Sequence, residues 1–179
     1  MDGCAVDGAH VRALNGGVHS GPSPVDRGRP GSKHHLVVDC HGVPLADTPT
    51  GGNRHDVTQL LPLLDLIPAI RGLRGRPRRL FADRGHDYDK YRRVLRRRGI
   101  TPRIARRGIT PRIARRGVAH GSGPGKTRWV VEQTFAWLHR FKRLRIRYEI
   151  RADLHPGLLQ LACSTVCLRE LRTSFRNDR

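Results

Sequence analysis

Glu132 is an acid whose position in the sequence needs a chemical explanation. It lies in Arg128-Trp-Val-Val-Glu-Gln-Thr-Phe-Ala-Trp-Leu-His139, a stretch with the hydrophobic spacing of a helix. The residues that share its face of that helix are Arg128, Phe135, Ala136 and His139. The helix is expected to start near Thr127, so Glu132 lies too far along it to be a capping residue. Carboxylates are ligands for hard cations, but an exposed salt bridge to Arg128, worth about 0.2–0.5 kcal/mol, would also account for this acid.

Two aspartates, Asp7 and Asp83, each follow a short apolar run. Leu80-Phe-Ala-Asp83 is typical of a buried parallel strand that presents an acid at its carboxyl end. Cys4-Ala-Val precedes Asp7 in the same way, although the dipeptide Asp7-Gly8 is by itself typical of a turn. A turn or capping role is also open for Asp83. The two aspartates nevertheless occur in the right order along the chain to meet Glu132.

The strands that must position these acids are separated by turn-forming segments. Residues 15–33 are rich in Gly, Pro and Ser and indicate a long loop. Residues 34–39 and 45–50 are predicted to be neighbouring antiparallel strands, with Asp39 as a turn residue after the first.

Helices are expected between and after these strands, at residues 56–67, at 88–98, around Glu132 and at 158–171. Asp56 is expected to be the N-cap of the first, with Gln59 three residues later. Pro62 should kink this helix or split off its first turn. The last helix is apolar and should pack against the sheet.

An exact internal repeat precedes the helix of Glu132. Residues Gly99–Arg107 recur as Gly108–Arg116, a tandem duplication of one nonapeptide within 99–116. Each copy can form one short strand, but the sheet needs only one, so the other copy is expected to form an arginine-bearing loop. Two copies are too few for a solenoid. A surface insertion of this length costs little loop-closure entropy.

The charge of the chain indicates a polyanionic partner. Its 179 residues fit one domain, 1–179, and contain 35 Lys and Arg against 15 Asp and Glu, a formal net charge of +20. Such a surplus repels itself unless a polyanion shares the surface, so nucleic acid is expected. Arginine dominates the basic residues, which suits bidentate phosphate contacts but is equally explained by a GC-rich genome.

Membrane insertion and a metal site built on cysteine are not indicated. No stretch approaches the roughly 18–20 apolar residues of a membrane span, so a soluble, cytoplasmic protein is expected. The four cysteines lack paired CxxC spacing, and Cys163 and Cys167 are expected to be buried free thiols in an apolar helix.

The order of elements, three strands followed by alternating helices and strands, resembles the RNase H-like fold, an α/β architecture with a mixed sheet flanked by helices. Five motifs resemble the catalytic domain of DDE transposases of bacterial insertion sequences, in the group named for insertion sequence five. They are Val6-Asp-Gly-Ala-His-Val-Arg12, Gly31-Ser-Lys-His-His35, Thr50-Gly-Gly-Asn-Arg-His-Asp56, Ala82-Asp-Arg-Gly85 and the start of the Glu132 helix, Arg128–Trp137. The similarity extends over nearly the whole chain.

This resemblance implies an activity and roles for particular residues. Asp7, Asp83 and Glu132 would be a catalytic triad that holds two Mg²⁺ ions, or Mn²⁺, about 3.5–4 Å apart for in-line displacement at phosphorus. The chemistry would cut DNA at the ends of the element and join the free 3′-ends to target DNA. DNA contacts are expected from Arg84, Lys126, Arg128, His139, Arg140 and Lys142. Self-association is also expected, because transposases generally act on paired ends.

The chain also departs from the pattern of that family. Related enzymes place Tyr, Arg, Glu and Lys along one helix, whereas Gly125 and His139 stand here at the first and last of these positions. The family's amino-terminal DNA-binding region has no counterpart in the sequence, so a truncated chain or a separate upstream polypeptide is expected. Two alternatives therefore stand beside an active transposase: an inactive remnant that binds DNA through its basic surface, and a basic RNA-binding protein.

Overall fold

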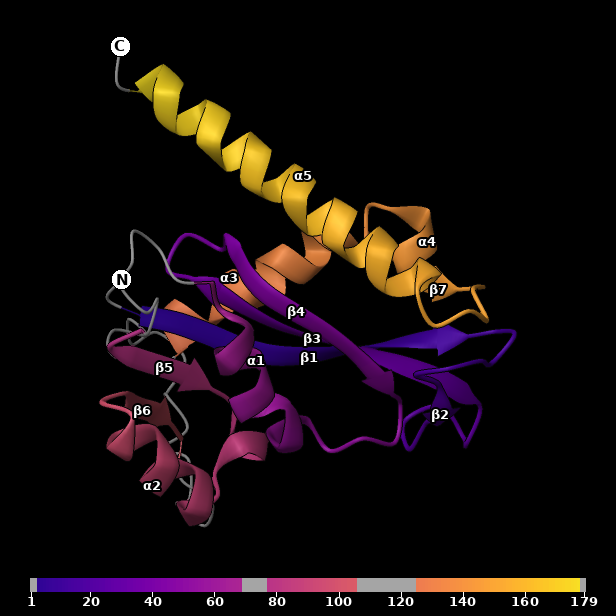
Figure 1. Cartoon of the computed structure of the whole chain (residues 1–179), viewed down its shortest axis with the longest axis horizontal. Coiled ribbons are helices and arrows are strands. Elements are labelled where there is room, and N and C mark those ends of the chain that lie inside the picture. The colour runs from indigo at the N-terminus through magenta and orange to yellow at the C-terminus, as the bar shows by residue number, and fades with distance from the viewer. Residues whose placement is uncertain (1–2, 69–76, 106–124, 178–179) are drawn as a thin grey trace, which may run out of the picture.

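A mixed sheet of seven strands forms the centre of the fold (Figure 1). The computed structural model describes residues 3–68, 77–105 and 125–177, without the side chains of 125–128 and 177. The strands in these ranges are β1 (Gly3–Ala13), β2 (Gly21–Pro22), β3 (Pro30–Asp39), β4 (Pro44–Gly51), β5 (Arg79–Ala82), β6 (Thr101–Ile104) and β7 (Ile146–Arg147). The α/β class and the mixed sheet predicted from the sequence are confirmed.

The strand order is β2-β3-β1-β5-β6, with β4 paired to β3 and β7 paired to β1. β1 is antiparallel to β3 and parallel to β5, and β5 is parallel to β6. The antiparallel pair β3 and β4 was predicted, and the turn between them is held by Asp39, whose Oδ1 accepts the backbone N–H groups of His41 and Val43 at 2.8 and 2.9 Å.

Helices cover both faces of this sheet. They are η1 (Asp56–Gln59), α1 (Leu60–Leu66), η2 (Arg84–His86), α2 (Asp89–Arg97), α3 (Gly125–Leu138), α4 (Lys142–Arg145) and α5 (Leu154–Asn177), the η elements being short 3₁₀ helices. Side chains of α1 and α2 form one buried cluster with Cys4 and Val6 of β1, whereas side chains of α3, α4 and α5 form another with Ala5. Because neighbouring residues of a strand point to opposite faces, β1 contributes to both clusters.

The expectation that Asp7-Gly8 by itself would form a turn is wrong. β1 continues through both residues, because it is paired with β3 from Cys4 to Arg12. Gly8 is needed for a steric reason: a Cβ at this position would lie 3.0 Å from Asp56 Oδ1 and 3.2 Å from His35 Nδ1. Gly8 therefore provides space for two polar side chains and not a special backbone conformation.

The predicted capping role of Asp56 is also wrong. His55 is the N-cap of η1, and no side-chain hydrogen bond caps this helix. The Asp56 carboxylate instead accepts a hydrogen bond from Lys33 Nζ at 2.9 Å. The expected split of the helix that contains Pro62 is confirmed, because η1 ends at Gln59 and α1 begins at Leu60.

The first copy of the nonapeptide supplies β6, which pairs with β5. Gly99, with a φ of 75°, ends α2, and Ile100 and Ile104 enter the core. The second copy, residues 108–116, lies outside the described residues. Residues 15–33, predicted to be loop, contain β2 and the start of β3.

The last helix is longer than predicted, and its N-terminal half packs against the sheet. Leu159, Ala162 and Val166 of α5 are buried against the sheet. The C-terminal half projects away from the sheet in Figure 1 and exposes Leu168 and Phe175. Among the residues that the structure describes, no helix is long and apolar enough to span a bilayer.

Candidate active site

The register between β1 and β5 sets Asp7 beside Asp83. These strands run parallel, with Ala5 opposite Phe81. Two residues further along each strand stand Asp7 and Asp83. Asp83 directly follows β5 but keeps extended backbone, with φ −75° and ψ 177°, so the strand geometry continues through it. The two aspartates are therefore neighbours across adjacent strands.

Both aspartates also belong to one face of the sheet. Ala5 and Phe81 contribute to the cluster that contains α3 and α5. Side chains two residues apart in a strand point the same way, so Asp7 and Asp83 follow Ala5 and Phe81 to that face. The sequence alone predicted acids near the ends of strands. The parallel register of β1 and β5 places both acids on the same face of the sheet.

Glu132 is carried by α3, the helix that covers this face. Val131 and Phe135 of α3 are buried in the same cluster as Ala5, while Glu132, next to Val131, is exposed. α3 contacts β1, β3 and β5, the strands around the two aspartates. The structure thus places all three predicted acids on one side of the sheet, from β1, the end of β5 and α3.

The Asp83 carboxylate has a buried histidine as its partner. His86 Nδ1 lies 2.6 Å from Asp83 Oδ1, and the His86 side chain is 3% exposed whereas that of Asp83 is 38% exposed. Because an ionised carboxylate only accepts hydrogen bonds, Nδ1 carries the proton of this bond. Gly85 makes the close turn possible, since a Cβ there would lie 3.0 Å from Asp83 Oδ1. Sequence reasoning missed His86; its position three residues after Asp83, across a glycine, was the available signal.

The other two acids are also held by neighbours. The backbone N–H of Gly8 donates to Asp7 Oδ1 at 2.8 Å, and each of the three acids has further interactions in the structure. Carboxylate oxygens at exposed or half-buried positions are a donor set that suits a hard divalent cation. Within the described ranges, however, no group of three His, Cys, Asp or Glu side chains is gathered closely enough to hold a metal ion.

The residues predicted to contact DNA have different environments. Arg84 is exposed directly after Asp83, Arg140 is exposed between α3 and α4, and Lys142 is exposed at the start of α4. His139 is half-buried beside Phe135, with ring centroids 6.3 Å apart, and burial lowers its pKa. The side chains of Lys126 and Arg128 lie outside the part of the chain that the structure describes.

A second polar cluster lies on the opposite face of the sheet. Asp56 Oδ1 is 2.9 Å from Lys33 Nζ and 3.7 Å from His35 Nδ1. His35 Nε2 lies 2.7 Å from Thr50 Oγ1, and burial lowers the pKa of His35 to about 4. The His35 ring is therefore neutral near pH 7. The sequence predicts only a capping role for Asp56, because its pairing with the distant Lys33 is not visible in local patterns.

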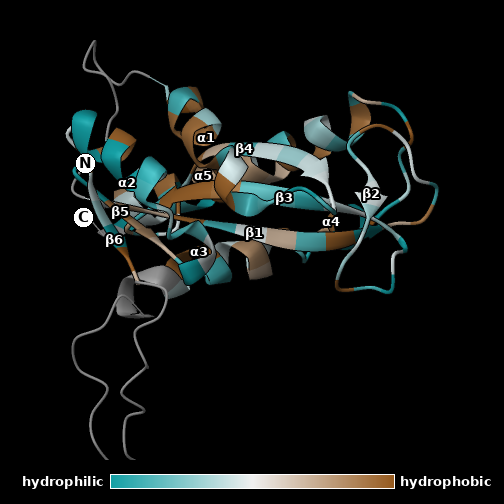
Figure 2. Cartoon of the chain, turned by 90° about the horizontal axis from the view of Figure 1, so that it is seen from below, coloured by the Kyte–Doolittle hydropathy of each residue, from teal (hydrophilic) through white to brown (hydrophobic). Residues whose placement is uncertain are grey.

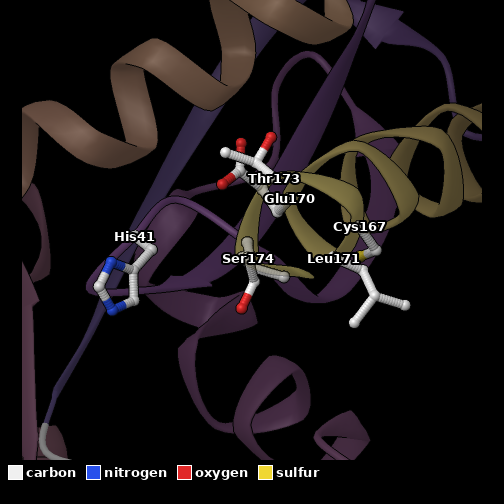
Figure 3. A pocket seen from close by; sticks show the side chains of 7 residues that line it. His41, Cys167, Glu170, Leu171, Thr173 and Ser174 are labelled. Carbon is white, nitrogen blue, oxygen red and sulfur yellow. The ribbon is translucent and has the colours of Figure 1, made fainter. Parts of the chain in front are cut away.

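A cavity of about 480 Å³ lies elsewhere, between the β3–β4 turn and α5 (Figure 3). The labelled side chains are His41 from the turn and five residues of α5, including Glu170. Its lining contains none of the three predicted acids. Glu170 is the one carboxylate among the lining residues, so this cavity does not provide the paired acids that two-metal chemistry needs.

Comparison with known proteins identifies the family of the chain. Residues 1–167 match the family described as "Transposase DDE domain". The chain is also 57% identical, over 157 residues, to a Burkholderia cepacia protein named "Putative transposase for insertion sequence element IS402"; the match covers 86% of this chain and 70% of that protein. The match and the mixed sheet flanked by helices agree with an RNase H-like fold, and the chain belongs to the DDE transposase family.

Proposed function

We propose that this chain catalyses metal-dependent DNA strand cleavage and strand transfer during transposition of an insertion sequence. Asp7, Asp83 and Glu132 are its catalytic acids and its metal ligands. Membership of the DDE transposase family, whose members normally use divalent metals, supports the class of reaction. The observation that carries the residue assignment is the register of β1 and β5, which sets Asp7 beside Asp83 on the face covered by α3.

The side chains divide the work as follows. Asp7 and Asp83 present neighbouring carboxylates from a rigid part of the sheet, and Glu132 approaches from the helix packed over them. His86 occupies Asp83 Oδ1 and so directs Oδ2 away from itself. When bound, divalent ions such as Mg²⁺ or Mn²⁺ supply charge stabilisation for the attacking and leaving oxygens. Arg84, Lys126, Arg128, His139, Arg140 and Lys142 contact the DNA backbone.

A strand-transfer assay with matched substitutions tests this proposal. A labelled duplex that carries the element end is incubated with target DNA and Mg²⁺ or Mn²⁺. We expect Asp83→Asn and Glu132→Gln each to lower the rate by at least about 10³-fold, the scale of losing one member of a catalytic unit. Asp153→Asn, which removes an exposed acid paired with Arg151, serves as the control and should leave the rate within about twofold.

The results separate the candidate functions. Metal-dependent products that vanish in Asp83→Asn and Glu132→Gln but persist in Asp153→Asn support the assignment. Salt-sensitive DNA binding with no products under either metal would contradict it and leave an inactive DNA-binding remnant. Equal activity of all three variants would show that other residues carry the chemistry.

The resemblance also predicts features that the family match alone leaves open. We assign the chain to the group named for insertion sequence five, with element ends and target DNA as its substrates. Self-association and recognition of the ends by a separate upstream polypeptide remain predictions. Light scattering with and without paired element ends would check the first. Co-purification with the product of the upstream reading frame would check the second.

A further inference from the structure

Helix α2 carries a row of basic side chains that the proposed catalytic mechanism does not use. Lys90, Arg93, Arg96 and Arg97 are all exposed, and we name them the α2 basic stripe. Their spacing of three and four residues places them on one side of the helix. Figure 2 shows most of α2 as hydrophilic. Like charges at such spacing repel by about 0.2–0.5 kcal/mol per pair, so the stripe costs stability unless an anion meets it.

Two other arginines of this segment, Arg92 and Arg98, form ion pairs that stabilise the fold. The arginines of the stripe form none with the residues that the structure describes. Arg92 donates to Asp87 Oδ1 and to the carbonyl oxygen of Ile104, both at 2.6 Å, and Arg98 donates to Asp65 at 2.6 Å. Within the described ranges, the side chains of Arg93, Arg96 and Arg97 form no hydrogen bond or ion pair with another residue.

Helix stability alone does not account for the stripe. Arg96 and Arg97 lie in the last turn, where a cation gains about 0.3–1 kcal/mol from the helix dipole. Arg93 and Lys90 lie before that turn and gain nothing comparable. Three exposed arginines within five residues, with no acid paired to them, form a concentrated patch of positive charge that can contact phosphate.

The stripe has a fixed position on the face of the sheet opposite to that covered by α3. α2 begins at Asp89, shortly after Asp83 and η2, and Leu95 anchors it in the cluster that contains Leu80 of β5. Arg92 ties the helix to Asp87 and to the end of β6. Because the packing of Leu95 and the hydrogen bonds of Arg92 hold α2 in place, its exposed face has a fixed position relative to β5.

We propose that the α2 basic stripe binds the phosphate backbone of duplex DNA. That the polyanion is DNA follows from the proposed function. The binding itself requires no metal ion. Arginine forks bind phosphate oxygens in pairs, and each phosphate contact releases counterions. The stripe therefore contributes sequence-independent affinity for DNA.

The chain offers a matched control on α5. Arg169, Arg172 and Arg176 are exposed, and the spacing of three and four residues places them on one side of that helix. They are interspersed with exposed apolar side chains, among them Leu168 and Phe175, so they do not form a purely basic face. Replacing three arginines by glutamine on either helix lowers the formal charge of +20 by the same amount.

The test compares Arg93→Gln/Arg96→Gln/Arg97→Gln with Arg169→Gln/Arg172→Gln/Arg176→Gln. Fluorescence anisotropy with a labelled 30-base-pair duplex, in EDTA and at salt concentrations from about 50 to 200 mM, gives the Kd and its salt slope. We expect the α2 triple to raise the Kd at least about tenfold and to reduce the slope of log K against log salt by about 2–3. The α5 triple should change the Kd less than about twofold.

The outcomes are decisive in both directions. Equal losses in the two triples, or an unchanged slope in the α2 triple, would overturn the proposal. Absence of DNA binding by the unsubstituted chain would overturn both this proposal and the proposed function. Stripe-dependent binding without metal-dependent strand transfer would uphold the stripe and reject the catalytic function. Arg93→Lys/Arg96→Lys/Arg97→Lys, which keeps the charge, should retain the salt slope and guards against misfolding of the glutamine triple.

Discussion

A single buried side chain, His86, orients Asp83, which we propose is a metal ligand. The hydrogen bond of 2.6 Å fixes the orientation of Asp83, and the burial of His86 fixes the ring that makes it. Groups that hold a metal ligand in place commonly change metal affinity by about 10–100-fold when they are removed. His86 is therefore a positioning residue for Asp83.

Substitution of His86 should change the requirement for metal more than the affinity for DNA. We expect His86→Ala to raise the Mg²⁺ concentration for half-maximal strand transfer by about 10–100-fold, because Asp83 loses its fixed orientation. His86→Asn, which keeps an N–H donor at a similar place, should recover part of that loss. Titration of strand transfer with Mg²⁺ measures the change, and anisotropy in EDTA provides the comparison. An unchanged Mg²⁺ requirement in His86→Ala would contradict the positioning role.

At the scale of elements, a buried polar contact joins α5 to β3. His34 Nε2 and His155 Nε2 are 2.7 Å apart, and His155 Nδ1 lies 3.2 Å from Glu149 Oε2. A neutral His155 that donates from Nδ1 to Glu149 must accept at Nε2, so His34 donates from its Nε2. His34 Nδ1 is then a buried atom without a partner in the described structure. A proton added to either ring would leave a buried N–H unpaired or opposed to another N–H.

This arrangement makes the packing of α5 sensitive to acid. Burial, and then the nearby His155, holds the pKa of His34 well below its usual 6.5, and burial also lowers the pKa of His155. Below pH 6.5 the unfolded chain takes up protons that the folded chain excludes, so stability is lost as the pH falls. Asp47 acts in the opposite direction, because burial raises its pKa to about 6 and its protonation favours the folded state.

Removing the histidine pair should flatten the pH dependence of stability. We expect the unsubstituted chain to lose about 1 kcal/mol per histidine of this pair between pH 7.5 and 5.5. His34→Leu/His155→Leu should lose correspondingly less over the same interval, with a smaller dependence left from His35, His10 and His139. Urea unfolding at the two pH values, in the same buffer and salt, measures the difference. An equal loss of stability in both proteins would mean that the histidine pair does not cause the pH dependence.

At the scale of the whole molecule, charge opposes the compact state. The formal charge of +20 is spread over 179 residues, and the described acids that could offset it are partly committed to particular arginines, such as Asp87 to Arg92. Repulsion among exposed cations is screened within about 10 Å at 0.1 M salt and is removed more completely by a bound polyanion.

A polyanion should therefore stabilise the chain more than an uncharged polymer. We expect dextran sulfate to raise the Tm by at least about 4 °C, because ligand that binds only the folded state adds roughly 2.7 kcal/mol at a concentration of 100 Kd. Uncharged dextran of equal mass is the matched control and should have little effect. Differential scanning fluorimetry in 50 mM salt compares the two. An equal Tm in both polymers would contradict the account of charge repulsion.

Features that depend on neighbouring residues could be predicted from the sequence, whereas features that depend on distant contacts could not. Hydrophobic periodicity and turn residues are local, so they predicted the strand before Asp83, the helix of Glu132 and the pairing of β3 with β4. The capping role given to Asp56 failed because Lys33, far away in sequence, competes for its carboxylate. Arg147 lies in a segment rich in arginine, yet it is buried and donates to Ser32 Oγ at 2.8 Å and to backbone oxygens, including that of Val18.

The sequence by itself determined the charge, the identity and order of the three acids, and the helix that carries Glu132. Only the tertiary structure decided that Asp7 continues a strand, that it stands beside Asp83 on the face under α3, and that His86 holds Asp83. The physical reason is that strand register and burial depend on contacts between distant residues. A parallel pairing shifted by one residue would have turned the two aspartates to opposite faces of the sheet.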